Sequence, residues 1–419
     1  MKYIRLAAVA VAVTAMLAAC SSSAPNTAAS GKIGGTVKLW YLEDPDSAFM
    51  PAVKKQFEAK YPGTTVELTE LPEDGFVTKI DTALLAHQPP DVSFIYEPRW
   101  MKAGQVLPLD DLLKKDSIDV SDYNPVAMSE CKYENKIYCI GTLTGSVTLI
   151  YNKTLFDKAG VAYPSTDVPM TIDEYADMAR KLKKGLGKTW GASAGAPFSW
   201  TDRRTTFSAD GKKVAVDDPS TVHMYDVLAG LVRDGVSPTP GDLQLTLPAD
   251  MLAAGDVAMS ITDTEYAAAS LAKAGFKWGV APPPVEKAGD KPFVFVGTDK
   301  YGVFKDSQNR ATAEALVSFL ATEGNQLRID VSDKPPLNTK LLPKWAGDDP
   351  GRKELSQVLA IKSEPELFIP SFWEVTAPLD DFYGQLASGD AQAKSGMKKL
   401  APELQVRLNR EWDTWNKIK

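Results

Sequence analysis

Cysteine and histidine are scarce in this chain, and their spacing restricts the chemistry that they can do. The chain of 419 residues has three cysteines and two histidines. Cys131 and Cys139 end the segment CKYENKIYC, where Glu134-Asn135 has turn chemistry between β-forming residues. The segment predicts a hairpin, closed by a disulfide if the chain is exported; a pair of free thiols is the alternative. We expect no metal site, because His87 and His223 are remote in sequence from these cysteines.

The same scarcity limits the enzyme classes that the chain could belong to. Two histidines exclude most acid–base constellations, and the sequence has no Gly-x-Ser-x-Gly, His-Glu-x-x-His or Cys–His nucleophile motif. A glycoside hydrolase needs only two carboxyl groups about 5–9.5 Å apart, and the many Asp and Glu residues make their presence uninformative. We therefore expect a non-enzymatic protein without a cofactor, with a secreted glycoside hydrolase as the alternative.

Carboxylates follow two predicted strands. Glu43 and Asp44 follow the strand 36–42, and Glu97 follows the buried strand 91–96. Ligands of parallel sheets bind beyond the carboxyl ends of the strands, which makes these carboxylates candidate ligand contacts. For Glu43 and Asp44 the alternative is that they cap the following helix.

The elements that must position these residues alternate between strand and helix. Apolar spacing predicts strands at 36–42, 65–71 and 91–96, separated by helices at 46–61 and 76–87. This order predicts a parallel sheet with helices on both faces, and the length is enough for two domains. Further along, strands are expected at 146–151, 257–261 and 293–304, and helices at 155–159, 171–184, 219–232, 311–320, 372–386 and 396–417.

The N-terminus predicts export. Lys2 and Arg5 precede an uncharged stretch at 6–19, which is typical of a signal peptide and too short to span a bilayer. The ending Leu17-Ala18-Ala19-Cys20 resembles the lipobox of bacterial lipoproteins, which implies that Cys20 is acylated and anchors the chain to the extracytoplasmic face of the cell membrane. Residues 20–35 are small and polar and predict a flexible linker. An ordinary secretory peptide is the alternative.

The net charge of the chain limits the partners that it could bind. The formal net charge is −7, which argues against nucleic acid and against a surface held to anionic lipid. No later segment of the sequence is long and apolar enough to span a bilayer, so we expect membrane contact through the lipid anchor only.

The order of several segments resembles a known family. The matching stretches are DVSFIYEPRWMKAGQVLPLDDLL, NKIYCIGTLTGSVTLIYNKTLFDKAG, LAAGDVAMSITDTE, KWGVAPPP, YGVF and IPSFWEVTAPL. In this order, behind a lipobox, they resemble the extracellular solute-binding proteins of ABC importers, in the carbohydrate-uptake group that contains maltose-binding protein.

The resemblance implies an α/β fold of two lobes with a ligand cleft between them. Hinge strands would cross near 146–151, 294–300 and 335–341. The N-terminal lobe would be 36–145 plus 300–334, and the C-terminal lobe 146–299 plus 335–419. A monomer would close on a sugar and deliver it to transmembrane permease subunits.

A neutral sugar needs polar groups for its hydroxyls and an aromatic plate for its C–H face. The candidate ligand contacts are Glu43, Asp44, Glu97, Arg99, Trp100, Thr144, Ser146, Trp200, Arg203, Asp263, Glu265, Tyr266, Asp299 and Trp373. The resemblance implies this role for most of them. Glu43 and Asp44 are included because they follow the first strand, Asp299 because it lies near a crossing, and Trp200 and Arg203 because their irregular stretch is rich in residues typical of a cleft. Gly145 stands where maltose-binding protein has a carboxylate, which argues against maltose itself.

Several of these residues have structural alternatives. Trp373 and Trp100 could be packing residues, and Arg203 could be half of a solvated pair. Arg203 and Lys300 also leave open a phosphorylated polyol or a charged sugar as the ligand. A third class, an adhesin or structural lipoprotein, would not require the two-lobe order.

Overall fold

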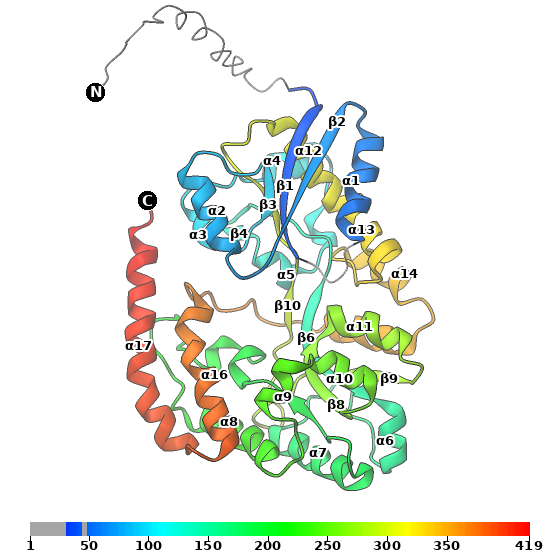
Figure 1. Cartoon of the computed structure of the whole chain (residues 1–419), viewed down its shortest axis with the longest axis vertical. Helices are drawn as coiled ribbons and strands as arrows, with labels where there is room; N and C mark the ends of the chain where they lie inside the picture. The colour runs from blue at the N-terminus through cyan, green and yellow to red at the C-terminus, as the bar shows by residue number, and fades with distance from the viewer. Residues whose placement is uncertain (1–30, 44–47) are drawn as a thin grey trace, which may run out of the picture.

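The computed structural model describes residues 31–43 and 48–419, except for the side chains of residues 265, 266, 268, 269 and 272. Cys20 and Asp44 lie outside the described residues. The chain forms two lobes, one above the other in Figure 1, each built on a sheet with helices around it. Among the described residues, none of the helices has both the length and the apolarity that a bilayer crossing requires.

The upper lobe holds a four-stranded sheet in the order β11-β3-β1-β2. β1 (Gly35–Leu42) pairs in parallel with β2 (Thr64–Leu71) and β3 (Val92–Phe94), and β11 (Tyr301–Val303) runs antiparallel to β3. This confirms the predicted β-α-β-α-β order. The helices of this lobe are α1 (Phe49–Lys60), α2 (Phe76–Leu85), α3 (Pro98–Lys102), α4 (Asp110–Lys115), α5 (Pro125–Ser129), α12 (Arg310–Phe319) and α13 (Asn325–Leu327).

Apolar spacing explains how α1 packs. Phe49, Val53 and Phe57 recur every four residues, so they lie on one face of the helix, and all three are buried. In the same core, Val37 and Leu39 alternate with exposed or partly exposed residues along β1 and are fully buried. The upper lobe thus has a packed core that fixes the carboxyl ends of β1 and β3.

A small hairpin projects from the upper lobe. β4 (Lys132–Tyr133) pairs antiparallel with β5 (Lys136–Ile137), and the turn residues Glu134 and Asn135 both have positive φ angles. The structure joins Cys131 to Cys139 in a disulfide across the base of this hairpin, the pairing that the sequence favoured over free thiols.

The lower lobe holds the second sheet, in the order β10-β6-β8-β7, with β9 also paired to β6. Its strands are β6 (Gly145–Asn152), β7 (Ser193–Ala194), β8 (Met259–Asp263), β9 (Trp278–Ala281) and β10 (Phe295–Gly297). Around it lie α6 (Lys153–Ala159), α7 (Ile172–Leu186), α8 (Pro219–Arg233), α9 (Pro240–Leu245), α10 (Pro248–Ala254), α11 (Thr264–Lys273), α15 (Pro350–Leu359), α16 (Phe372–Ser388) and α17 (Ala393–Lys417). The capping box predicted at Thr171 and Glu174 is confirmed.

Three segments cross between the lobes. The predicted strand 293–304 is wrong as one strand: β10 pairs with β6 in the lower sheet, whereas β11 belongs to the upper sheet. The third crossing lies beside the first, because the Thr144 amide donates to the Pro335 carbonyl at 2.8 Å. α14 (Leu342–Ala346) follows this crossing. The lobe boundaries given above stay a prediction.

The C-terminal helix makes a further connection between the lobes. α17 packs on α16 and α8 in the lower lobe and runs up to α2 and α3 of the upper lobe (Figure 1). There the Lys102 ammonium donates to the Trp415 carbonyl at 2.8 Å and lies 4.8 Å from the centre of its ring. The ring of Tyr133, from the hairpin, meets Trp415 edge to face at 6.2 Å. This contact, Lys102–Trp415–Tyr133, is called the α17 contact below.

Candidate ligand-binding cleft

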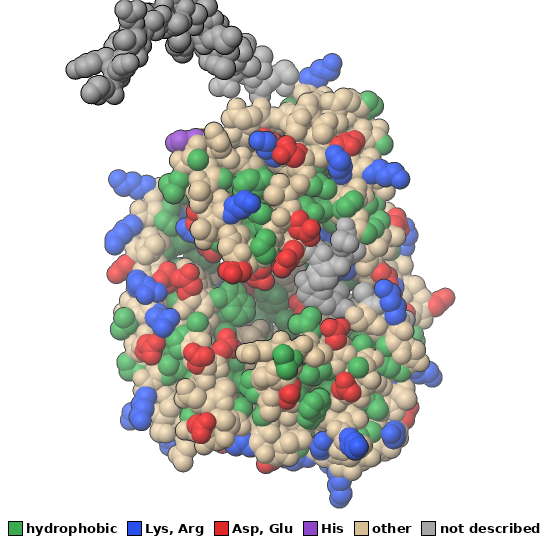
Figure 2. Space-filling model, viewed as in Figure 1, with side chains coloured by type: hydrophobic (Ala, Val, Ile, Leu, Met, Phe, Trp, Pro, Cys, Tyr) green, Lys and Arg blue, Asp and Glu red, His purple; other side chains and the backbone are tan. Residues whose placement is uncertain are grey.

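A cleft of about 1930 Å³ lies between the two lobes and takes its lining from both. Figure 2 shows it as a hollow at the centre of the molecule, with carboxylates along its upper rim. Its size and its two-sided lining make it the candidate binding site among the described residues.

The upper wall is built at the carboxyl end of β3. The Tyr96 hydroxyl donates to the Glu73 carboxylate at 2.9 Å, and burial raises the pKa of Tyr96. Burial also raises the pKa of the Glu97 carboxyl, which the Arg99 guanidinium at 3.5 Å opposes. The cleft thus presents a phenol and a carboxyl group that are both held in place.

Asp81 of α2 positions the residues that follow Glu97. Its carboxylate accepts from Arg99 at 2.7 Å and from the Trp100 indole at 2.9 Å. Arg99 lines the cleft, but Trp100 does not: it is 1% exposed and packs 6.1 Å from Phe304. The expectation that Trp100 contacts ligand is therefore wrong, because one turn of helix directs it into the core.

Asp299 lines the cleft from a crossing segment, but its carboxylate is occupied by hydrogen bonds to other residues near the crossing. Its carboxylate accepts from the Thr142 amide and hydroxyl at 2.6 and 2.5 Å, from the Leu143 amide at 3.1 Å and from Arg328 at 2.9 Å. The structure therefore gives Asp299 a structural task at the crossing, which the sequence did not indicate.

The predictions for Thr144 and Ser146 are wrong, because side chains alternate between the two faces of an extended strand. Both are buried and neither lines the cleft, whereas Gly145 and Val147 do. Successive side chains point to opposite faces of extended backbone, so the residues chosen from the sequence lie on the wrong face. The Thr144 hydroxyl instead donates to the Pro336 carbonyl at 3.1 Å.

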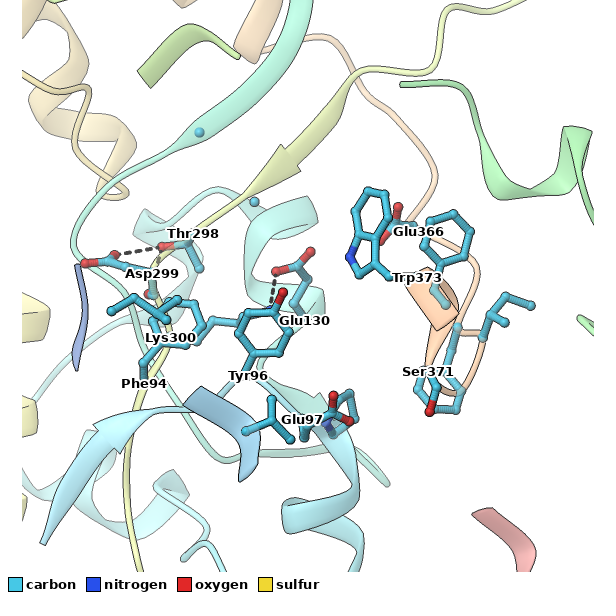
Figure 3. Close-up of a pocket in the computed structure, with 18 of the residues that line it drawn as sticks. Phe94, Tyr96, Glu97, Glu130, Thr298, Asp299, Lys300, Glu366, Ser371 and Trp373 are labelled. Atoms are coloured by element: carbon cyan, nitrogen blue, oxygen red, sulfur yellow. Dashed lines mark hydrogen bonds and ion pairs between the residues drawn. The ribbon is translucent and has the colours of Figure 1, made fainter. Parts of the chain in front are cut away.

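Two ion pairs line the cleft. Lys300 pairs with Glu130 at 3.1 Å, and Figure 3 shows both residues. Arg203 pairs with Glu366 at 2.7 Å. The Arg203 guanidinium also lies 3.8 Å from the centre of the Phe372 ring. Burial, with Glu130 nearby, raises the pKa of Glu366 to about 7 although Arg203 opposes this shift. Both cations singled out in the sequence are thus partnered by carboxylates.

Trp373 is the most exposed of the described aromatic side chains that line the cleft. It is 53% exposed, and Figure 3 shows it across open space from Tyr96 and Lys300. Phe372 and Phe198 pack edge to face against it at 5.0 and 6.1 Å. Its ring is therefore fixed in position while more than half of its surface stays available.

The remaining predicted residues divide into three groups. Glu43 and Asp263 line the cleft. Trp200 also lines it but is only 2% exposed. Glu265 and Tyr266 lie in α11, and their side chains are outside the described residues.

Sequence reasoning missed several lining residues. They are Glu130, Tyr133, Glu366, Phe368, Glu374, Trp412 and Trp415. The stretch 364–373, EPELFIPSFW, concentrates carboxylates and aromatics without helical spacing, and this signal could have pointed to more than Trp373. Trp412 and Trp415 gave no signal, because they read as one face of a helix.

Solved structures share this architecture. An ABC substrate-binding protein of Listeria monocytogenes, in complex with cycloalternan, is 24% identical with a TM-score of 0.76, over 90% of this chain and 99% of that one. UgpB of Mycobacterium tuberculosis, in complex with glycerophosphocholine, is 19% identical with a TM-score of 0.73 over the same shares. These likenesses confirm the two-lobe fold.

Relatives found by sequence align with most of the chain. A galactooligosaccharide-binding protein of Bacillus subtilis is 21% identical over 409 residues, which are 93% of each chain. A binding protein of Brucella abortus is 26% identical over 294 residues, 65% of this chain and 68% of the relative. The model of the bacterial extracellular solute-binding protein family matches residues 40–327. With the two-lobe fold and the cleft between its lobes, this match means that the chain belongs to the bacterial extracellular solute-binding protein family.

Proposed function

We propose that this protein captures a neutral sugar or oligosaccharide outside the cytoplasm and delivers it to the permease subunits of an ABC importer. The observation that carries the proposal is the exposed Trp373 ring, which faces Tyr96 and Glu97 across a cleft between two lobes. A sugar presents an apolar C–H face to an aromatic ring and hydroxyls to carboxylates and phenols.

Binding would close the lobes. A ligand that touches Trp373 on one lobe and Glu97 on the other has more contacts in a closed form than in an open one. The ligand therefore shifts the population toward closure by its difference in affinity for the two forms. The closed form is what a permease would distinguish from the empty protein.

The related proteins support a carbohydrate. One relative is named as a galactooligosaccharide-binding protein, and the Listeria structure is in complex with cycloalternan. The Mycobacterium structure, in complex with glycerophosphocholine, is the reason to weigh a phosphodiester as well.

The ion pairs favour the sugar over the phosphodiester. A phosphate is held by cations that are free to pair with it. Here Arg203 and Lys300 are already paired with Glu366 and Glu130, so a phosphate would have to displace a partly buried carboxylate and leave it without its cation. A neutral sugar leaves both pairs intact.

The lipid anchor is part of the proposal. Acylation of Cys20, with the linker 20–35, would keep the two lobes near the permease. Replacing Cys20 with Ala should release the protein from the membrane fraction into the medium. A C20A protein that stays with the membrane to the same extent as the wild type would contradict the anchor.

A ligand screen tests the binding proposal. Purified protein is heated with sugars, glycerophosphodiesters and polyamines in turn, since a ligand that binds the folded state raises the melting temperature. We expect oligosaccharides to raise it, with saturable binding in calorimetry and no product formed. Stabilisation by glycerophosphodiesters or polyamines alone would refute a sugar ligand, and cleavage of the sugar would indicate a hydrolase.

Replacing Trp373 with Ala tests the site. The variant should bind the best sugar more weakly by about 1–3 kcal/mol, because it loses the stacking surface. Tyr163→Ala is the matched control: Tyr163 is an exposed aromatic of the same lobe that does not line the cleft.

A further inference from the structure

Among the described side chains, two exposed aromatic ones line the cleft, and both lie on one short segment of the lower lobe. Trp373 is 53% exposed and Phe368 is 37% exposed. Solvent-exposed aromatic surface in a concave site is unfavourable until something covers it. Trp373 has a place in the proposed function, whereas Phe368 has none so far.

Phe368 is held from behind by the C-terminal helix. Its ring lies 5.9 Å from that of Trp412, edge to face, and 4.6 Å from that of Trp415. Trp412 is fixed in turn, because its indole donates to the Gly211 carbonyl at 2.7 Å. Trp415 is fixed by the α17 contact. A ring that is supported on this side and open toward the cleft loses little side-chain entropy on binding.

The two rings are close enough along the chain for one extended ligand to reach both. Phe368 and Trp373 are five positions apart, so their Cα atoms are separated by at most about 18 Å. The residues between them, Ile369 to Phe372, also line the cleft. The wall is thus continuous from one ring to the other.

We propose that Phe368 is a second stacking platform, which makes the ligand an oligosaccharide with at least two sugar rings. The proposal rests on the sugar-binding function given above. Trp373 would stack on one ring, and Phe368 on another ring nearer the end of α17. The aromatic support that the C-terminal helix gives to Phe368 would then help to set the preferred length of the ligand.

A length series tests this proposal by calorimetry. Wild type, Phe368→Ala, Trp373→Ala and the control Tyr163→Ala are titrated with mono-, di-, tri- and tetrasaccharides of glucose and of galactose. We expect Phe368→Ala to weaken the longer sugars by about tenfold and to leave the shortest sugar that binds unchanged. Trp373→Ala should weaken all of them, and Tyr163→Ala none.

Other results would overturn the proposal. It fails if Phe368→Ala leaves the affinity for every length unchanged, or if it lowers all of them equally. Phe368→Leu keeps the packing against Trp412 and Trp415 but lacks a ring, so it must reproduce the length-dependent loss if stacking is the cause. If no sugar of any length binds to the wild type, the proposed function itself is wrong, which is a different result from a flat length series.

Discussion

Asp299 lines the ligand cleft and also accepts hydrogen bonds from the backbone of a crossing segment. The sequence alone does not distinguish these two roles. The Asp299 carboxylate accepts hydrogen bonds from Thr142, Leu143 and Arg328, and from the neighbouring Thr298 hydroxyl at 3.2 Å. A carboxylate that a sugar could use and a carboxylate that a chain crossing needs look alike in a sequence. Only the pairing of distant segments decides between them.

Replacing Asp299 with Ala should lower the free energy of unfolding by about 3–5 kcal/mol, because Arg328 is 2% exposed and its charge would lose this carboxylate. Urea denaturation measures the change. Asp413→Ala, at an exposed position on α17, is the control and should change stability by less than about 0.5 kcal/mol. An equal effect of the two substitutions would contradict the task that we assign to Asp299.

Glu366 makes stability depend on pH. Its pKa is about 7 in the folded protein, against an ordinary value of 4.5, so the folded state holds a proton that the unfolded state has lost between these values. The unfolding free energy should therefore fall as pH rises from about 4.5 to about 7. Glu366→Gln should flatten this part of the profile, measured by denaturation at pH values on both sides of the window. A variant profile as steep as that of the wild type would count against it.

At the scale of elements, local sequence patterns predicted the structures that depend on neighbouring residues. Apolar spacing placed α1 and its buried face, and turn chemistry placed the disulfide hairpin. The segment 293–304 has β-forming residues throughout, and yet it supplies β10 to one sheet and β11 to the other. Strand propensity says nothing about the partner, so the break at Thr298–Lys300 is fixed by long-range pairing that a single sequence does not display.

The crossing also depends on close backbone approach. A Cβ atom at Gly141 would lie 1.9 Å from the Thr298 hydroxyl oxygen and 2.1 Å from the Asp299 carbonyl oxygen. Gly141→Ala should therefore push the first and second crossing segments apart and lower stability by about 1–3 kcal/mol. Gly384→Ala is the matched control, because nothing lies within 4 Å of a Cβ there and alanine favours the surrounding helix α16. Thermal denaturation compares the two, and equal melting temperatures would refute the prediction.

At the scale of the whole molecule, the two lobes and the open cleft predict a change of shape. Saturating sugar should reduce the radius of gyration measured by small-angle X-ray scattering, because closure brings the lobes together. Trp373→Ala should need more sugar for the same change, since it loses affinity and not the ability to close. A radius of gyration that does not respond to a bound sugar would exclude closure as the signal to a permease.

The family resemblance in the sequence also predicted features of the whole molecule, namely two lobes and a cleft between them. It could not give the far end of the cleft, because Trp412 and Trp415 reach the site only through the length and direction of α17. Twenty-five residues of regular helix carry them from the lower lobe to the upper one. Such a placement depends on how helices pack, which one sequence without its fold does not specify.

The α17 contact has a mechanical consequence. A rigid body held to another at two separated places can turn only about the line that joins them. The three crossing segments, which adjoin β6 and β10, are one attachment between the lobes, and Lys102 with Trp415 is the other. A motion that preserves both attachments therefore has a single rotational degree of freedom, about the axis that passes through them. Twisting or sliding of one lobe over the other must first separate Trp415 from Lys102.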